Sequence, residues 1–401
     1  MTSSEHETYV LALMKEIGSM AVEYETNAGS NEFSRSKVLE ISSKLTTALQ
    51  TPQETIIQQL MFPPQPTCIR LGISLDLFRI ISKRGNKSIS TVELAAMCGA
   101  DLRLVKQIMR VLAAIGFVME SDEEMYKSSM LTQEMIKPSI EGAVKACYDI
   151  GAKTAYEAPD YFELNGYKYP TGPTDTPFQN ALKTNLDYFK YLNEHPEQAK
   201  AFQSWMIVNQ IQKPNWLEWF PVQTQILDGF DKNKGDNALL VDIGGGHGQY
   251  LELFKKRFPH SGRLILQDLS YAIDTLNLSE GIETMSHNFF DPQPVRGARV
   301  FFLHWILHDW SDQEAGRILR HIASAMTPGY SKLIINESIL PDKQCPLAYA
   351  AMSIMMMVQT ASHERSRKEW RELLQSAGLE VVEFYDPPVV GEGVIEVIRK
   401  D

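Results

Sequence analysis

An apolar run over residues 238–243, with Asp242 near its end, leads directly into closely spaced glycines, Gly244, Gly246 and Gly248. Glycines so placed let the backbone turn tightly and let a ligand lie against main-chain N–H groups at a helix N-terminus. A dinucleotide-binding loop has the spacing G-x-G-x-x-G, and the position of its last glycine is here Gln249. The loop therefore favours a nucleoside that carries an amino-acid tail over a pyrophosphate.

Asp268 ends the next apolar run, 20 residues after Gly248. In an open α/β sheet, a carboxylate at this place accepts hydrogen bonds from ribose hydroxyls. An acidic residue at a strand end can instead cap the helix that follows. Because the glycine loop precedes it, Asp268 is a candidate cofactor ligand.

A third candidate is His308, which follows another apolar run and precedes Ser311 and Glu314, spaced as a capping box that opens a helix. This places His308 at the carboxyl end of a strand, the edge where doubly wound sheets bind ligands. A single histidine is usually structural, but Glu337 ends the next strand and Glu364 follows a Met-rich helix. A histidine near two carboxylates can hold one tautomer and act as a general base near neutral pH.

The composition limits the class of protein. The chain has 401 residues, enough for about two or three domains, and its net charge of −11 disfavours binding to nucleic acid or an acidic membrane. The four cysteines lack metal-ligand spacing, and no apolar run reaches the roughly 18 residues that span a bilayer. The polar N-terminus predicts no targeting segment. We therefore expect a cytoplasmic protein with a small-molecule ligand and with no metal, nucleic-acid or membrane partner.

Strands and helices are expected to alternate from residue 238 onward, which predicts an α/β fold with a doubly wound parallel sheet. The expected strands span residues 238–243, 263–268, 300–304 and 332–337, the helices 249–258 and 312–326, and a closing hairpin 381–399.

Residues 1–135 are expected to form a helical domain that contains a winged-helix unit, with a helix over 71–82, two more helices and a hairpin. Residues 70–130 hold nine Lys or Arg against seven Asp or Glu, and the hairpin turn at 122–124 is acidic. Packing and dimerisation are therefore favoured over DNA binding. Residues 136–230, helical and broken by prolines, are expected to form a cap over a substrate pocket, and residues 231–401 the catalytic domain.

These motifs together resemble the S-adenosylmethionine-dependent O-methyltransferases of the caffeate and flavonoid type and their fungal natural-product relatives. The resemblance covers nearly the whole chain and is carried in order by residues 241–248, 266–269, 308–312, 336–337 and 363–365. It implies a class I methyltransferase sheet, an N-terminal winged-helix dimerisation domain, S-adenosyl-L-methionine as cofactor and a homodimer.

The resemblance also gives roles to single residues. His308 becomes the base that deprotonates a substrate hydroxyl, flanked by Glu337 and Glu364. The expected cofactor contacts, with Phe289 beside the adenine, are Asp242, Gly244, Gly246, Asp268, Leu269, Asn288, Phe289 and His304. The expected substrate contacts are Phe202, Met206, Trp305, Met352 and Met356, although helical spacing alone fits a core stripe for the methionines equally well.

Two positions depart from the family pattern. Asn288 stands where the family usually has an aspartate that accepts from the adenine amino group, and His304 stands where plant members often have lysine. An asparagine can still accept through its carbonyl, so the change is expected to alter the affinity for the cofactor before its identity.

Three functions compete. The first is methyl transfer to a hydroxyl of an aromatic or polyketide-like small molecule in secondary metabolism. The second is a pericyclic or dehydration reaction by an enzyme that binds S-adenosylmethionine without methylating, as in some fungal relatives. The third is a winged-helix regulator. The retained His308, Glu337 and Glu364 favour methyl transfer, and the acidic wing weakens the regulator.

Overall fold

The computed structural model describes residues 3–26, 32–210, 213–274, 276–388 and 391–400. The chain divides into two compact units, the first of Met1–Tyr148 with Lys200–Val208 and the second of Asp149–Ala199 with Asn209–Asp401. Helix α13 (Pro196–Gln210) supplies residues to both. None of the helices within the described ranges is long and apolar enough to cross a membrane.

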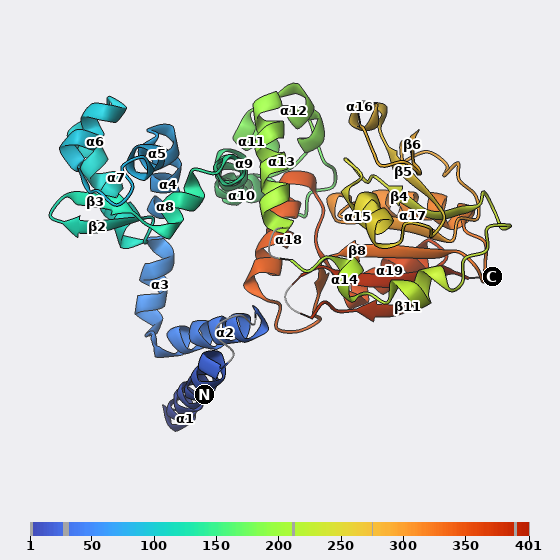
Figure 1. Ribbon diagram of the computed structural model, residues 1–401, viewed down its shortest axis with the longest axis horizontal. Coiled ribbons are helices and arrows are strands. Elements are labelled where there is room, and N and C mark those ends of the chain that lie inside the picture. The colour runs from blue at the N-terminus through green and yellow to red at the C-terminus, as the bar shows by residue number, and fades with distance from the viewer. Residues whose placement is uncertain (1–2, 27–31, 211–212, 275, 389–390, 401) are drawn as a thin grey trace. The chain divides into compact units, whose positions relative to one another are not determined.

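The first unit begins with helices α1 (Ser3–Thr26), α2 (Glu32–Leu49) and α3 (Pro52–Leu60) (Figure 1). Helices α1 and α2 pack together around Leu13, Met20 and Ile41. Helix α3 opens with a capping box formed by Thr51 and Glu54, and none of its residues is buried in this chain.

Four helices and a small sheet share the other core of the first unit. They are α4 (Pro64–Ser74), α5 (Leu77–Ser82), α6 (Thr91–Cys98), α7 (Leu102–Ala114) and the strands β1 (Ile89–Ser90), β2 (Val118–Asp122) and β3 (Met125–Ser128). The prediction of one helix over 71–82 is wrong, because Asp76 has a left-handed backbone (φ 54°) that separates α4 from α5. Helices α8 (Met130–Met135) and α9 (Pro138–Ala146) follow.

A seven-stranded sheet with the order β11-β12-β8-β7-β4-β5-β6 organises the second unit. Its strands are β4 (Ala238–Ile243), β5 (Arg263–Asp268), β6 (Ile282–Ser286), β7 (Val300–His304), β8 (Lys332–Glu337), β11 (Leu379–Tyr385) and β12 (Gly393–Arg399). Strand β12 runs antiparallel to both of its neighbours, and the other described pairs are parallel. The predicted doubly wound sheet is confirmed. Strand β6 was not predicted, because it is an edge strand in which Glu283, Thr284 and Ser286 are exposed and which therefore forms no apolar run.

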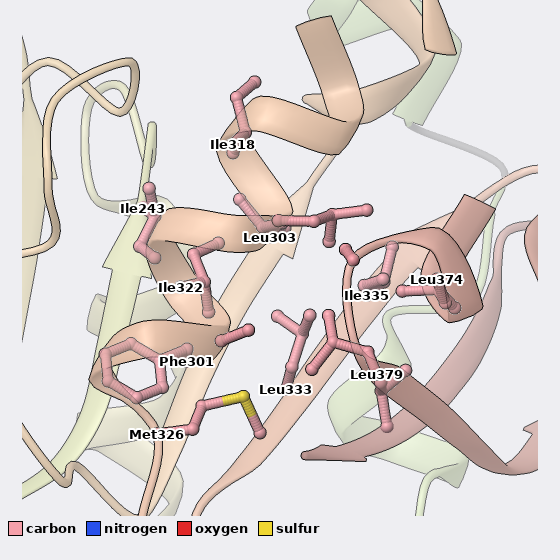
Figure 2. Packing of buried hydrophobic residues seen from close by; sticks show 14 of the residues in the cluster. Ile243, Phe301, Leu303, Ile318, Ile322, Met326, Leu333, Ile335, Leu374 and Leu379 are labelled. Atoms are coloured by element: carbon pink, nitrogen blue, oxygen red, sulfur yellow. The ribbon is translucent and has the colours of Figure 1, made fainter. Parts of the chain in front are cut away.

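Helices cover both faces of this sheet. Helices α17 (Asp312–Ala325) and α19 (Arg367–Ser376) pack on one face, where Ile318 and Ile322 share one core cluster with Phe301 and Leu333 (Figure 2). Helices α14 (Trp216–Trp219) and α15 (Gln249–Arg257) pack on the other. Because successive residues of a strand point to opposite faces, β7 serves both cores and is buried on both sides.

The remaining helices of the second unit include α10 (Lys153–Leu164), α11 (Pro177–Leu182), α12 (Tyr188–Glu194), α16 (Ser270–Ile273) and the Met-rich α18 (Leu347–Thr360). Both α10 and α11 contact α18, and α18 contacts the short 3-10 helix η3 (Leu307–Asp309). The short strands β9 (Ile339–Leu340) and β10 (Arg365–Ser366) pair in parallel, with Arg365 opposite Ile339.

Candidate active site

The strand order reverses between β4 and β7, because the chain leaves β4 for β5 and β6 and returns to β7 on the other side of β4. Open α/β sheets bind ligands in the crevice outside the carboxyl ends of the strands at such a point. Asp268 ends β5, His304 ends β7 and Glu337 ends β8, while the glycine loop follows β4. The main sequence-predicted residues therefore share one edge of the sheet.

The glycine loop is held to Asp268. Gly244, Gly246 and Gly248 have φ angles of 71°, 57° and 75°, which side-chain-bearing residues rarely adopt. The N–H of Gly246 donates to Oδ2 of Asp268 (2.8 Å), and the N–H of Leu269 donates to Oδ1 (2.7 Å). A Cβ placed on Gly246 would have no atom within 4 Å, so a ligand can approach the backbone there.

Asp242 is buried next to this loop with an unsatisfied carboxylate. It is 1% exposed, and neither of its oxygens has a hydrogen-bond partner among the described residues. Burial, with a further contribution from the charge of Asp268, raises its pKa to about 7. A buried acceptor without a donor is costly, so the site fits a ligand that brings donors, such as the ammonium group of an amino acid.

Aromatic rings lie on the other side of the loop. The Phe289 ring would stand 3.6 Å from a Cβ on Gly244, and it contacts Trp310 with ring centroids 5.9 Å apart. The side chain of Asn288 is exposed and accepts from the N–H of Phe290 (3.1 Å). Phe289 therefore offers an apolar surface beside the loop.

His304 is engaged by the protein through both ring nitrogens. Its Nδ1 lies 3.1 Å from two acceptors of Asn336, the backbone and side-chain oxygens, so Nδ1 carries the proton. Its Nε2 accepts from the hydroxyl of Tyr250 (2.9 Å). Burial lowers the pKa of His304 to about 3, and the ring is neutral. Its contact with a cofactor stays a prediction.

His308 lies in η3 and is paired with Glu364. Its Nδ1 is 2.9 Å from Oε1 of Glu364, a carboxyl that is 2% exposed. Because the carboxylate accepts, Nδ1 carries a proton, and Nε2 of the neutral ring keeps its lone pair. Burial lowers the pKa of His308, but the charges of Glu364 and Asp309 outweigh burial and raise it to about 10.

The side chain of Glu337 binds the backbone of the same loop and not the ring of His308. Its Oε1 accepts from the N–H groups of Ile306 (3.1 Å) and Leu307 (2.7 Å). It is fully buried, and burial raises its pKa to about 7 although the charge of His308 lowers it. Asp309, which the sequence analysis did not single out, lies with Oδ1 3.7 Å from Nε2 of His308.

The predicted substrate contacts are only partly brought together. Trp305 is buried with an unusual positive φ of 51°, and its ring lies 6.2 Å from that of His308. Met352 and Met356 are half-buried in α18, the helix that contacts η3. Phe202 and Met206 belong to the first compact unit, and their role stays a prediction. Within the described part of the chain, no group of three or more His, Cys, Asp or Glu could hold a metal ion.

Comparison with known proteins gives the family. A model of the O-methyltransferase domain matches residues 177–380. The O-methyltransferase asqD of Emericella nidulans is 38% identical over 374 residues, which cover 90% of this chain and 96% of that protein. The chain belongs to the O-methyltransferase family. The predicted family, the predicted enzyme class and methyl transfer to oxygen are therefore confirmed.

Solved structures extend the likeness to the cofactor. The structure of LepI in complex with SAM and a structure described as a pericyclic reaction enzyme each have a TM-score of 0.83 and 30% identity, and each covers 98% of this chain and 100% of the matched chain. The class I methyltransferase sheet and the cofactor S-adenosyl-L-methionine, both predicted from the sequence, are confirmed.

Proposed function

We propose that this O-methyltransferase transfers the methyl group to a hydroxyl of an aromatic or polyketide-like small molecule, with His308 as the general base. The observation that carries the proposal is the 2.9 Å contact between Nδ1 of His308 and Glu364, which leaves Nε2 to receive the hydroxyl proton. Glu337 supports the same loop from its other side.

Three residues would hold the cofactor, which when bound supplies an activated methyl group on a sulfonium. The unpartnered carboxylate of Asp242 suits the ammonium group, and Asp268 suits the ribose hydroxyls. The ring of Phe289 suits the adenine.

The pKa of His308 suits a phenolic hydroxyl. A phenol has a pKa of about 10, so only about a thousandth of it is ionised at pH 7. Because the charges of Glu364 and Asp309 raise the pKa of His308, the unprotonated ring is a strong enough base to take the proton of such a hydroxyl. The carboxylates of Glu364 and Asp309 then stabilise the imidazolium that forms, and alignment of the attacking oxygen supplies much of the remaining rate.

The side chains beside His308 suit a flat aromatic substrate. Trp305 offers a large ring, and the thioethers of Met352 and Met356 adapt to such shapes. We propose that the cap predicted for residues 136–230 contributes to this pocket through α10 and α11, which contact α18.

Mass spectrometry of the purified protein tests the function. Incubation with S-adenosylmethionine and a panel of phenolic and polyketide compounds should yield a product heavier by one methyl group and an equal amount of demethylated cofactor. The likeness to a pericyclic reaction enzyme makes an isomerase the second candidate. A product of unchanged mass, formed without loss of cofactor, would favour it and contradict methyl transfer.

The pH dependence of the reaction should report on Glu364. As a base His308 must be unprotonated, so kcat/KM should rise with pH through the pKa of His308. The variant Glu364→Gln removes a charge that raises this pKa, so the rise should move to lower pH by about one unit or more. The exposed Glu372→Gln serves as the control, because Glu372 lies near Lys368 on the surface. A rise at the same pH in both variants would show that Glu364 does not tune the base.

We also propose that residues 1–135 form a winged-helix dimerisation domain and that the chain is a homodimer. The order of α4 to α7 with the hairpin of β2 and β3 is typical of a winged helix. Helix α3 and the residues after it leave large apolar side chains exposed in the single chain, namely Ile56, Ile57, Leu60, Met61 and Phe62. A second copy of the chain would cover such a face.

Sedimentation measures this directly. The full-length protein should sediment as a dimer at micromolar concentration, and the double variant Ile57→Glu with Leu60→Glu should sediment as a folded monomer. Thr55→Glu, a charge on the same helix at a polar position, should remain dimeric. A wild-type protein that is folded and monomeric would contradict the proposal.

A further inference from the structure

We propose that Arg365 is a positioning residue that fixes the loop of His308 and joins this loop to the aromatic rings on the cofactor side. The inference rests on the proposed role of His308 as the general base. Arg365 is 1% exposed and lies directly after Glu364 in β10.

The guanidinium group donates hydrogen bonds to the loop on both sides of His308. Its Nη1 donates to the carbonyl of Leu307 (2.8 Å), and its Nη2 donates to the carbonyl of Trp310 (2.8 Å). Its Nε donates to Oδ1 of Asp312 (2.9 Å) at the start of α17. A planar guanidinium holds five donors in one fixed geometry, whereas a lysine ammonium is a single point that cannot span these acceptors.

Neighbours of Arg365 bind the same loop. The hydroxyl of Ser362 donates to the carbonyl of His308 itself, and Glu364 accepts from the ring. On the other side, Glu337 accepts from the N–H groups that precede His308. The carbonyl groups of the loop are thus bound by Arg365 and Ser362, and its N–H groups are bound by Glu337. This leaves the imidazole little freedom to turn.

Trp310 connects Arg365 to the aromatic rings on the cofactor side of the site. Its carbonyl is bound by Arg365, and its ring meets Phe290 edge-on (centroids 4.7 Å apart) and Phe289 (5.9 Å). Phe289 is the ring that we place beside the adenine. One side chain therefore fixes the base and also the tryptophan against which the proposed adenine platform rests.

Arg365 is itself held firmly enough for this role. Its strand pairs with β9, where Arg365 stands opposite Ile339, two residues after Glu337. Its guanidinium lies over the ring of Trp370 at 5.3 Å. The short β9-β10 pair therefore brings both carboxylates and the guanidinium to one loop from two segments of the chain.

Two variants of Arg365 and a matched control test the role. Arg365→Lys keeps the positive charge but cannot reach the carbonyls of Leu307 and Trp310 together. It should lower kcat roughly 10- to 100-fold, with a smaller change in KM for the acceptor. The rise of activity with pH should also move to lower pH, because a loose loop weakens the contact between His308 and Glu364. Adding guanidinium ion at millimolar concentration should restore part of kcat in Arg365→Ala. Arg367→Lys, at a half-buried arginine paired with Asp386, should match the wild type.

The outcomes separate this inference from the proposed function. His308→Ala is assayed beside these variants, and if it is as active as the wild type, the base assignment fails. If His308→Ala is inactive while Arg365→Lys matches Arg367→Lys in kcat and pH profile, the positioning role is wrong. Should Arg365→Lys not fold, Ser362→Ala decides, because it removes the donor to the His308 carbonyl, together with one hydrogen bond to Thr360, and leaves the ring of His308 in place. A wild-type kcat and pH profile in Ser362→Ala would then overturn the inference.

Discussion

Replacing His308 with alanine is expected to lower turnover roughly 10²- to 10⁴-fold, the range for a lost acid or base group. The reason is that only Nε2 of this ring is left to take the proton when Nδ1 is bound to Glu364. The affinity for S-adenosylmethionine should remain nearly unchanged, because the groups that we assign to the cofactor lie on β4, β5 and the segment of Phe289.

His308→Asn separates the chemistry from the packing. An asparagine amide can donate to Glu364, as Nδ1 does, but it cannot take up a proton at neutral pH. Both His308→Ala and His308→Asn should therefore bind cofactor in calorimetry and fail in single-turnover assays. Any activity that remains in either variant should lack the rise with pH that follows the pKa of His308. His260→Ala, at an exposed histidine, should behave as the wild type. Wild-type turnover in His308→Ala would remove the base from the mechanism.

The sequence predicts residues at strand ends well, because parallel strands bring their carboxyl ends to one edge. Asp268 and Glu337 each close an apolar run and Asp242 is the last residue but one of its run, and the structure places each at that edge. The glycine spacing likewise predicted a tight turn of the backbone, and Gly244, Gly246 and Gly248 have positive φ angles. These features are local, so a single stretch of sequence is enough to predict them.

Contacts between distant segments could not be predicted in this way. His308 and Glu364 are 56 residues apart, and no local pattern predicts the hydrogen bond between the ring and the carboxylate. The β9-β10 pair that brings them together has two residues in each strand, too few to show an alternating pattern. For the same reason the sequence pattern does not predict the hydrogen bonds from Arg365 to the carbonyls of Leu307 and Trp310.

Hydrogen bonds between side chains and backbone groups could not be predicted from the sequence either. Asp268 was expected to bind a ribose, and the structure shows that it also holds the N–H groups of Gly246 and Leu269. Glu337 was expected beside the ring of His308, and its hydrogen bonds go to the N–H groups of Ile306 and Leu307. Sequence patterns report side-chain types, whereas these bonds depend on where the main chain turns.

The proposed contact of Asp268 with the ribose, added to its hydrogen bonds with the loop, makes its replacement the second large effect. Asp268→Ala should weaken S-adenosylmethionine binding by roughly 1.5 to 3 kcal/mol, about 10- to 150-fold, because charge-assisted hydrogen bonds to the ribose are lost. The N–H groups of Gly246 and Leu269 lose their acceptor at the same time, so the loop is less well ordered before the cofactor arrives. Calorimetry on the purified variant measures the affinity.

Asp268→Asn divides this loss between its two causes. An asparagine keeps one carbonyl oxygen, which can hold one of the two N–H groups, but it has no charge for the ribose hydroxyls. Its affinity should therefore fall between those of the wild type and of Asp268→Ala. Asp274→Ala, at an exposed carboxylate six residues further on, should bind as the wild type does. If Asp268→Ala also binds with wild-type affinity, Asp268 contacts only the loop, and the ribose must be held by another group at this edge of the sheet.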